Sequence, residues 1–503
     1  MRLATLVLTS LFTGTAFAAE TPWPTAAWQT STPEEQGMSS GALADLIETV
    51  GMRMQDSLLI VRHGRIVVEA YYAPYRSGIP HDLRSVTKSI VGTLTAIEVR
   101  EGVLDATTHP VLDLLADKQI ANVDDIKKAM AVQNLLDMTS GIMWQEKNYT
   151  PDETIGRMYQ APDRTAFVLD QPMSDPPGAK FKYNSGNAYG LSAIITSKTG
   201  KDAWDYAKQK LFAPLGVFTA RWRQPDAQGV TDGESGLSLE PRDMLKIGYL
   251  YRHEGMWDGQ QIMPASWVAY AASGKVPATF GLHYANLWWS MPEKGALMAL
   301  GRHSQWILVL PKYDIVAAMT GYMPDDEYYP PARFIDDIAA ALRSDSALPP
   351  DAIGQSALAA SIAAAANERA LPVGETPALQ QSLSGRTYRL DENRLHITTI
   401  TLRLTGEEPM WVLATSSGQP GAVTQSFPGP LGLDGRFRLA AQNRFGIAAA
   451  RGRWVSDNGL EIERRYLGAS ATQRWLLTFE ANNIAVHFAD TDGTKADLQG
   501  RAD

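Results

Sequence analysis

An alanine-rich stretch bounded by prolines, residues 346–375, divides the sequence into two parts with different patterns. Its sequence, SALPPDAIGQSALAASIAAAANERALPVGE, is typical of a linker that contains a weak helix. A chain of 503 residues also exceeds what one hydrophobic core usually serves. We therefore expect two folded domains, over residues 27–345 and 376–503, joined by this linker.

The first part of the chain has strand patterns at both ends and helical patterns between them. Residues 57–72 are two β-rich runs around His63-Gly64, which predicts a hairpin. Strand-like apolar runs return at residues 285–291 and 304–321. This arrangement predicts an α+β fold, in which strands from both ends form one antiparallel sheet flanked by helices, next to a helical region.

After the linker, the pattern is that of an all-β domain. Alternating runs occupy residues 395–404, 451–467 and 474–490, and turn signals occur at Asn458-Gly459 and Asn482-Asn483. Regularly spaced short strands of this kind predict an antiparallel barrel or sandwich.

The first 18 residues predict a secretory signal peptide. Arg2 gives one early positive charge, an apolar stretch too short to span a bilayer follows, and Ala16-Phe17-Ala18 has the small residues of a cleavage site. With cleavage before Ala19, we expect a periplasmic or secreted protein. The chain has no cysteine, so an exported form has no disulfide and depends on core packing.

Composition and missing motifs narrow the partners and the chemistry. The net charge of -9 gives no basic footprint, so nucleic acid is not an expected partner, and no later stretch is apolar enough for a membrane span. The G-x-S-x-G and H-E-x-x-H motifs are absent, which argues against an α/β-hydrolase and a zinc hydrolase. We expect neither a metal nor another cofactor, and no sequence feature addresses the oligomeric state.

Ser85 and Lys88 form the only S-x-x-K in the chain. On a helix, positions i and i+3 share a face, so the hydroxyl and the amine can meet, and the helix dipole favours an alkoxide at the first turn. A lysine must lose its charge to act as a base, so burial or a neighbouring cation would have to lower its pKa. Taken alone, the same spacing also fits an ordinary solvated helix face.

Tyr183 follows a Pro/Gly turn and precedes a helical pattern, a place from which a side chain can project into a cleft. The alternative is a buried tyrosine with a satisfied hydroxyl. Ser185 and Asn187 form an S-x-N just after it, so either Tyr183 or Ser185 could be the second proton shuttle.

The stretch LGRHSQWILVLP, residues 300–311, reads as an apolar strand entered through polar residues. As an edge strand it could offer a backbone N–H to a tetrahedral oxyanion, opposite the N–H of Ser85, with Arg302, His303 and Ser304 beside the substrate. The alternative is a core strand with a polar start. The KTG at residues 198–200 reads instead as a helix stop.

Together and in this order, these segments resemble the superfamily of serine β-lactamases and penicillin-binding proteins, on the branch of class C β-lactamases, family VIII esterases and 6-aminohexanoate-dimer hydrolases. The resemblance covers about residues 38–343 and is carried by SVTKS, LLDMTSGIMW, PPGAKFKYNSGNAYGLS, LEPRDMLKIGYLY and GRHSQWILVLP. It implies that Ser85 is the acylated nucleophile, that Lys88 lowers its proton affinity, and that Tyr183 is the general base and later the acid.

Two positions depart from the resembled pattern. Ser185 falls where many relatives have asparagine, which puts an amide contact with the substrate in doubt. His303-Ser304-Gln305 stands at the position of a Lys-Thr-Gly strand motif, and a mostly neutral histidine is a poorer partner than lysine for a β-lactam carboxylate. Penicillin hydrolysis is therefore disfavoured. The C-terminal domain resembles the lipocalin-like barrels attached to some of these enzymes, and no ligand follows from that.

We expect a serine hydrolase that cleaves an ester or amide bond of a small molecule or peptide through an acyl-enzyme on Ser85. One rival is a D,D-carboxypeptidase or another cell-wall peptide amidase of the same fold, and another is a non-catalytic sensor or wall-binding protein. Four aromatic residues near the motifs could line an acyl pocket or equally pack in the core. They are Trp144, Tyr149, Trp288 and Trp289.

Overall fold

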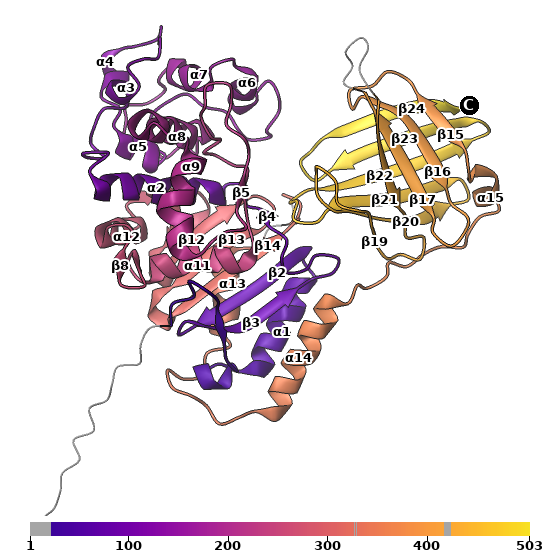
Figure 1. The fold of residues 1–503 in the computed structure, drawn as a ribbon, viewed down its shortest axis with the longest axis horizontal. Coiled ribbons are helices and arrows are strands. Elements are labelled where there is room, and N and C mark those ends of the chain that lie inside the picture. The colour runs from indigo at the N-terminus through magenta and orange to yellow at the C-terminus, as the bar shows by residue number, and fades with distance from the viewer. Residues whose placement is uncertain (1–21, 326, 328, 417–423) are drawn as a thin grey trace, which may run out of the picture.

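The computed structural model describes residues 22–325, 327, 329–416 and 424–503. The expected signal peptide, residues 1–18, lies outside the described residues. Figure 1 shows an N-terminal domain of mixed helices and strands and a C-terminal β domain beside it. Within the described ranges, no helix is both long and apolar enough to cross a membrane.

A nine-stranded sheet organises the N-terminal domain. Its order is β1-β3-β2-β14-β13-β12-β11-β10-β9, and every pairing except β1 with β3 is antiparallel. The early hairpin β2–β3 pairs through β2 with the late strand β14, so both ends of the domain build one sheet, as the sequence predicted. The strands are β1 (Gln29–Thr30), β2 (Gln55–Arg62), β3 (Arg65–Tyr71), β9 (Val276–Pro277), β10 (His283–Ala285), β11 (Trp288–Met291), β12 (Ala296–Gly301), β13 (Gln305–Leu310) and β14 (Ile315–Gly321).

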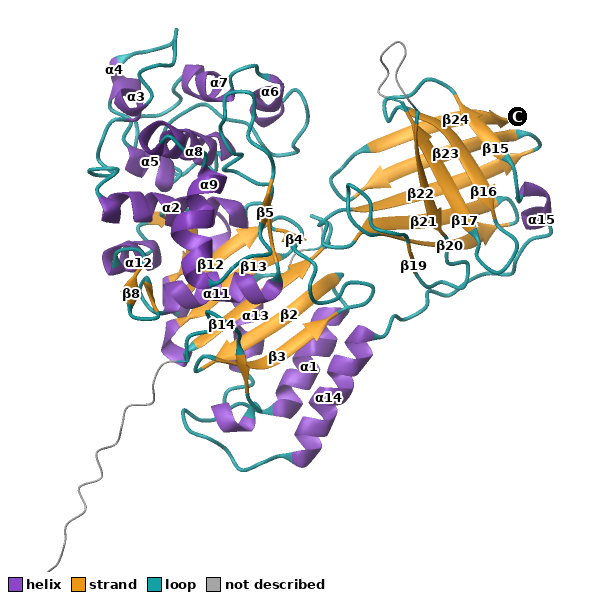
Figure 2. Ribbon diagram, in the orientation of Figure 1, coloured by secondary structure: helices purple, strands orange, loops and turns teal. Residues whose placement is uncertain are grey.

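Helices cover both faces of this sheet (Figure 2). One face packs against α1 (Ser40–Gly51), α13 (Pro331–Ala339) and α14 (Ala352–Ala366) in one hydrophobic core. The other face packs against α2 (Val86–Glu101), α11 (Pro241–Arg252) and α12 (Ala265–Ala272), in a second core that extends into the helical region. That region contains α3 (Val111–Leu114), α4 (Asp125–Lys128), α5 (Val132–Leu136), α6 (Thr154–Gln160), α7 (Arg164–Asp170), α8 (Ser185–Thr199), α9 (Ala203–Ala207) and α10 (Ala213–Leu215).

The alanine-rich stretch at residues 346–375 contains a 15-residue helix, α14. This helix is more than a spacer, because it lies along α1 and β3 and contributes Leu358 to the core of the first domain. The irregular connection to the β domain follows it, up to α15 (Leu379–Leu383).

The C-terminal domain is one ten-stranded sheet in the order β18-β17-β16-β15-β24-β23-β22-β21-β20-β19. All its pairings are antiparallel, and it curls into a nearly closed barrel around its own apolar core (Figure 1). The strands are β15 (Thr387–Leu390), β16 (Ile397–Arg403), β17 (Met410–Thr415), β18 (Gln425–Pro430), β19 (Arg438–Leu439), β20 (Ala448–Ser456), β21 (Gly459–Tyr466), β22 (Thr472–Glu480), β23 (Asn483–Asp490) and β24 (Lys495–Ala502).

Buried charges attach the barrel to the first domain. Arg465 of β21 binds Asp56 of β2, and neither side chain is exposed. Asp56 also pairs with His81, at 3.0 Å, and the Arg465 guanidinium lies 3.6 Å from the centre of the Tyr322 ring. A buried ion pair is costly to break on one side only, so these contacts fix how the barrel meets the first domain.

One buried carboxyl group on α2 has no role in these contacts. No hydrogen-bond partner within the described part of the chain reaches either carboxylate oxygen of Glu98. Burial raises the pKa of Glu98 to about 8, although Lys198 opposes the shift. The side chain is therefore uncharged at neutral pH.

We expect Glu98→Gln to stabilise the protein more at pH 9 than at pH 5. A raised carboxyl pKa means that only the folded state holds the proton between the unfolded and folded pKa values, so stability falls as pH rises through that window. The shift from 4.5 to about 8 corresponds to a loss of about 5 kcal/mol that glutamine avoids. Thermal unfolding at both pH values measures it, with the exposed Glu293→Gln as the control. A benefit independent of pH would contradict this account.

Candidate active site

Ser85 stands at the N-terminal end of α2. It is the N-cap residue, but its side chain makes no capping hydrogen bond, so the hydroxyl is free for other contacts. The residue before it, Arg84, has a φ of 47°, in the left-handed region that non-glycine residues rarely adopt. This sharp turn places the hydroxyl where the helix dipole favours negative charge.

Lys88, one turn along α2, approaches the hydroxyl directly. Its Nζ lies 2.9 Å from Ser85 Oγ, and the side chain is 1% exposed. The same nitrogen donates to the Glu234 carbonyl at 2.9 Å and to Glu234 Oε2 at 3.3 Å. The i, i+3 spacing thus brings amine and hydroxyl together, and the loop after β5 (Arg221–Trp222) supplies a carboxylate.

Several neighbouring groups influence the pKa of Lys88. Burial alone would lower the pKa of the amine, but Tyr183, Glu234 and Glu146 outweigh burial and raise it. In turn, burial would raise the pKa of Glu234, but Lys88 lowers it below its usual value. These neighbours favour the ammonium form of Lys88, which can stabilise an alkoxide on Ser85.

Tyr183 lies on the other side of this pair, just before α8. Its side chain interacts with Ser85 and with Lys88, whose Nζ is 5.1 Å from the ring centre. Burial raises the pKa of the phenol, whereas the Lys88 charge and the hydrogen bonds to Ser85 and Lys88 oppose the shift. The Tyr183 hydroxyl therefore lies beside the Ser85 hydroxyl and the Lys88 amine.

Glu146 is a second buried carboxyl group near Lys88 and Tyr183. Its carboxylate accepts hydrogen bonds from the Ser185 backbone N–H at 2.8 Å and from Trp144 Nε1 at 2.5 Å. Burial raises the pKa of Glu146 to about 7, against the lowering effect of Lys88. Ser185 is fully buried, and its hydroxyl lies 3.3 Å from Glu146, so it does not reach substrate.

The end of β12 passes beside the nucleophile. β12 is an internal strand rather than an edge strand, since β11 and β13 flank it, but residues 299–301 extend beyond its pairing with β11. A Cβ on Gly301 would lie 3.2 Å from the Ser85 nitrogen and 2.4 Å from the Leu83 carbonyl oxygen. Only glycine allows the end of β12 to come this close to Ser85. Opposite the Ser85 N–H, β12 therefore has backbone groups that are not paired with β11.

His303 and Ser304 lie in the turn between β12 and β13, not on a strand as their alignment with Lys-Thr-Gly implied. Both have positive φ values, 65° and 74°. Three residues are needed to connect the antiparallel strands at this point, and this takes His303 and Ser304 out of the β12 register. They still face the site, because both line the same pocket as Ser85.

A pocket of about 250 Å³ opens above Ser85. Tyr183, Trp289 and Tyr149 form part of its wall, and Trp289 stacks on Tyr183 with ring centres 5.8 Å apart. Arg302, His303 and Ser304 also line the pocket, and the Arg302 guanidinium lies 4.9 Å from the centre of the Tyr149 ring. Three other predicted residues do not line this pocket but are buried in the core around it: Trp144, Asn187 and Trp288.

Sequence reasoning missed the two carboxylates of the site. Glu146 and Glu234 lie in loops without a recognised motif, and no spacing relates them to Ser85 or Lys88. The one signal was chemical, since a buried lysine requires a nearby anion. Among the described residues, no cluster of three or more His, Cys, Asp or Glu could hold a metal ion.

Comparison with known proteins agrees with this fold. The 6-aminohexanoate-dimer hydrolase of Paenarthrobacter ureafaciens is 24% identical over 326 residues, which cover 59% of this chain and 81% of the relative. The structure of EstCE1, a hydrolase with promiscuous acyltransferase activity, aligns with a TM-score of 0.51 and 15% identity over 59% of this chain and 99% of its own. A penicillin-binding protein homologue from Caulobacter crescentus aligns with a TM-score of 0.50 and 14% identity over 62% of this chain and 99% of its own.

The fold and these relatives define a serine hydrolase of the β-lactamase and penicillin-binding-protein class. The profile of the Beta-lactamase family matches residues 43–339, more than half of the chain. The chain therefore belongs to the Beta-lactamase family.

Proposed function

We propose that this protein is an exported serine hydrolase that cleaves an ester or amide bond through an acyl-enzyme on Ser85. One observation carries the proposal: the Lys88 ammonium lies 2.9 Å from Ser85 Oγ at the floor of a pocket that Tyr183 also lines. Two relatives support it by name, one a hydrolase of 6-aminohexanoate dimers and one a hydrolase with acyltransferase activity. Export rests on residues 1–18, and N-terminal sequencing of the mature protein should begin at Ala19.

In this mechanism, each side chain of the site has one role in the reaction. Tyr183 accepts the Ser85 proton as the hydroxyl attacks the carbonyl carbon, and Lys88 stabilises the negative charge that develops on Oγ. The Ser85 N–H and an N–H at the end of β12 hold the oxyanion. Tyr183 then gives its proton to the leaving alcohol or amine, and water attacks the acyl-enzyme to release the acid.

A substrate panel tests this function. We expect the mature protein to hydrolyse 4-nitrophenyl esters with a burst of one nitrophenol per active site, because acylation splits the reaction into two steps. Simple N-acyl amides form the second arm, and a peptide ending in D-alanyl-D-alanine forms the third.

Release of D-alanine without turnover of the esters or simple amides would replace this proposal with a cell-wall carboxypeptidase. No turnover in any arm, together with no labelling by a serine-reactive phosphonate, would favour a non-catalytic binding protein.

A further inference from the structure

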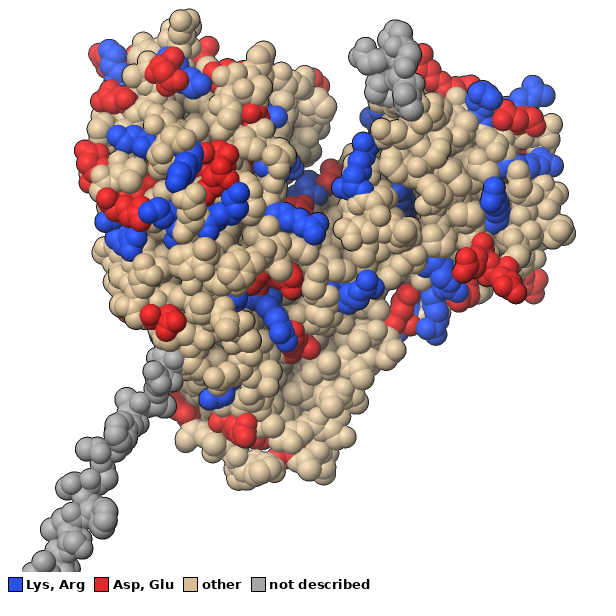
Figure 3. All heavy atoms as spheres, in the orientation of Figure 1, with Lys and Arg blue, Asp and Glu red and all other residues tan. Residues whose placement is uncertain are grey.

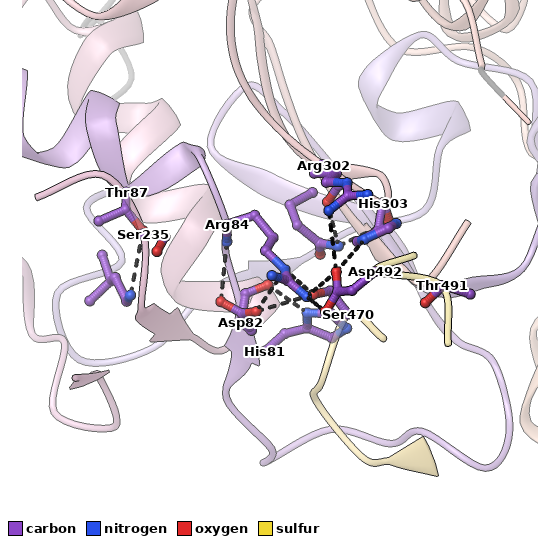
Figure 4. Close-up of polar contacts among 12 residues, drawn as sticks. His81, Asp82, Arg84, Thr87, Ser235, Arg302, His303, Ser470, Thr491 and Asp492 are labelled. Atoms are coloured by element: carbon purple, nitrogen blue, oxygen red, sulfur yellow. Dashed lines mark hydrogen bonds and ion pairs between the residues drawn. The ribbon is translucent and has the colours of Figure 1, made fainter. Parts of the chain in front are cut away.

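One carboxylate of the C-terminal barrel, that of Asp492, contacts residues of the active-site wall. Asp492 lies in the turn between β23 and β24, and Figure 4 shows it below Arg302 and His303, beside Arg84. It accepts two hydrogen bonds from Arg84 Nη2, at 2.8 and 2.9 Å, and lies 3.0 Å from His303 Nε2. Arg302 Nη1 approaches it at 3.5 Å. Two of these partners line the pocket above Ser85.

Both ring nitrogens of His303 face hydrogen-bond acceptors. Nδ1 lies 2.8 Å from the Met323 carbonyl oxygen, and Nε2 lies 3.0 Å from Asp492 Oδ1. Because both neighbours are hydrogen-bond acceptors, this geometry suits a ring that donates from both nitrogens. The carboxylate comes from a part of the chain 189 residues away, so the sequence alone could not place it beside His303.

Asp492 balances the charge of this corner of the pocket. Burial would raise its pKa, but the hydrogen bond from His303 and the charge of Arg84 outweigh burial and hold the pKa well below its usual range. Three cationic and three anionic side chains meet here, each cation paired: Arg84, Arg302 and His303 with Asp82, Asp325 and Asp492. Without Asp492, Arg84 and His303 would lose this carboxylate partner next to Ser85.

On the face drawn in Figure 3, blue and red side chains are interspersed rather than gathered in a patch of one sign. This face therefore offers no single-sign patch that would select between charged and neutral substrates. Asp492 is a local group that can do so, since its ion-pair partners belong to the pocket wall.

We propose that Asp492 is a specificity-determining residue, supplied by the barrel, that selects acyl groups without a charge at the His303 wall. It neutralises that wall and already occupies the position from which a substrate carboxylate would bind the same cations. The inference rests on the proposed hydrolase function. It names the substrate class as acyl groups whose distal end is uncharged, and it gives the barrel a part in the active site.

A matched pair of esters tests this selection. The 4-nitrophenyl ester of hexanoic acid and the mono-4-nitrophenyl ester of adipic acid have acyl chains of the same length, but only the second ends in a carboxylate. In the unchanged protein, kcat/KM should favour the hexanoate. In Asp492→Asn, the ratio of adipate to hexanoate kcat/KM should rise about tenfold or more, because the substrate carboxylate can then take the place of Asp492 beside Arg84 and His303.

The control changes charge equally but elsewhere. Asp497→Asn removes one carboxylate from the same hairpin, where Asp497 pairs with His487 and is 86% exposed, so the ratio should stay within twofold of the unchanged protein. Asp492→Ser is a second variant in case asparagine disturbs the turn. A change in the ratio of the two kcat/KM values indicates a role in substrate selection. If the substitution only displaced Arg84, both esters would be slowed alike and the ratio would not change.

A binding measurement keeps the inference separate from the hydrolase proposal. In a Ser85→Ala background, Asp492→Asn should make free adipate, but not hexanoate, raise the melting temperature. If no ester is hydrolysed but adipate stabilises the variant, the hydrolase proposal fails and the assignment of Asp492 stands. An unchanged ester ratio and no stabilisation by adipate in folded variants would overturn the assignment.

Discussion

Ser85→Ala is expected to abolish turnover, with kcat falling by about 10⁴-fold or more. Ser85 lines the pocket and its hydroxyl lies 2.9 Å from the Lys88 amine, so we expect no other residue to replace it as the acylated group. The ion pair between Lys88 and Glu234 remains in this variant, so the fold and the melting temperature should be retained. Stopped-flow measurement of nitrophenol release gives both the burst and the steady-state rate.

The control for this variant is another serine of the same domain. Ser197 on α8 donates a hydrogen bond to the Leu114 carbonyl oxygen and does not line the pocket, so Ser197→Ala should keep full turnover. A Ser85→Ala enzyme with an undiminished burst would show that another group is acylated.

Tyr183→Phe is expected to lower kcat by about 10²-fold to 10⁴-fold, the usual contribution of a positioned general base. Phenylalanine keeps the stacking on Trp289 and removes only the hydroxyl that faces Ser85 and Lys88. KM should change little, because the ring that lines the pocket remains. Steady-state kinetics with a 4-nitrophenyl ester measure both constants.

The pH profile distinguishes proton transfer from packing. Burial raises the pKa of Tyr183, so the phenolate is a minor form at neutral pH and kcat/KM of the unchanged protein should rise toward alkaline pH. The variant should lose this rise. Tyr313→Phe, in the turn at the other end of β13, is the control and should retain both rate and profile. An equal alkaline rise in Tyr183→Phe would assign the proton to another group.

The parts of the structure that local signals encode could be predicted from the sequence. The hairpin β2–β3 follows from two β-rich runs around His63-Gly64, and the end of α8 follows from Gly200, whose φ is 68°. The S-x-x-K spacing alone brings amine and hydroxyl within 2.9 Å, because one helical turn fixes their distance. The α+β fold and the barrel followed from the same kind of pattern.

The electrostatic partners of these residues could not be predicted. Glu234 pairs with Lys88 and Asp492 with His303, yet 146 and 189 residues separate the members of each pair. No periodicity or motif records such contacts, which only the tertiary fold creates. The sequence also could not predict which aromatic residues line the pocket. Trp288 and Trp289 are neighbours in the sequence, but only Trp289 lines the pocket. Their alternation across β11 decides which one faces substrate.

The most direct test of the acyl-enzyme is to find where the chain is acylated. The mature protein, treated with a fluorophosphonate or quenched during turnover of a slow ester, is digested and its peptides are sequenced by mass spectrometry. We predict one adduct per chain, on the Ser85 hydroxyl, and none in Ser85→Ala. An adduct on any other residue, or equal modification of both proteins, would contradict the central claim.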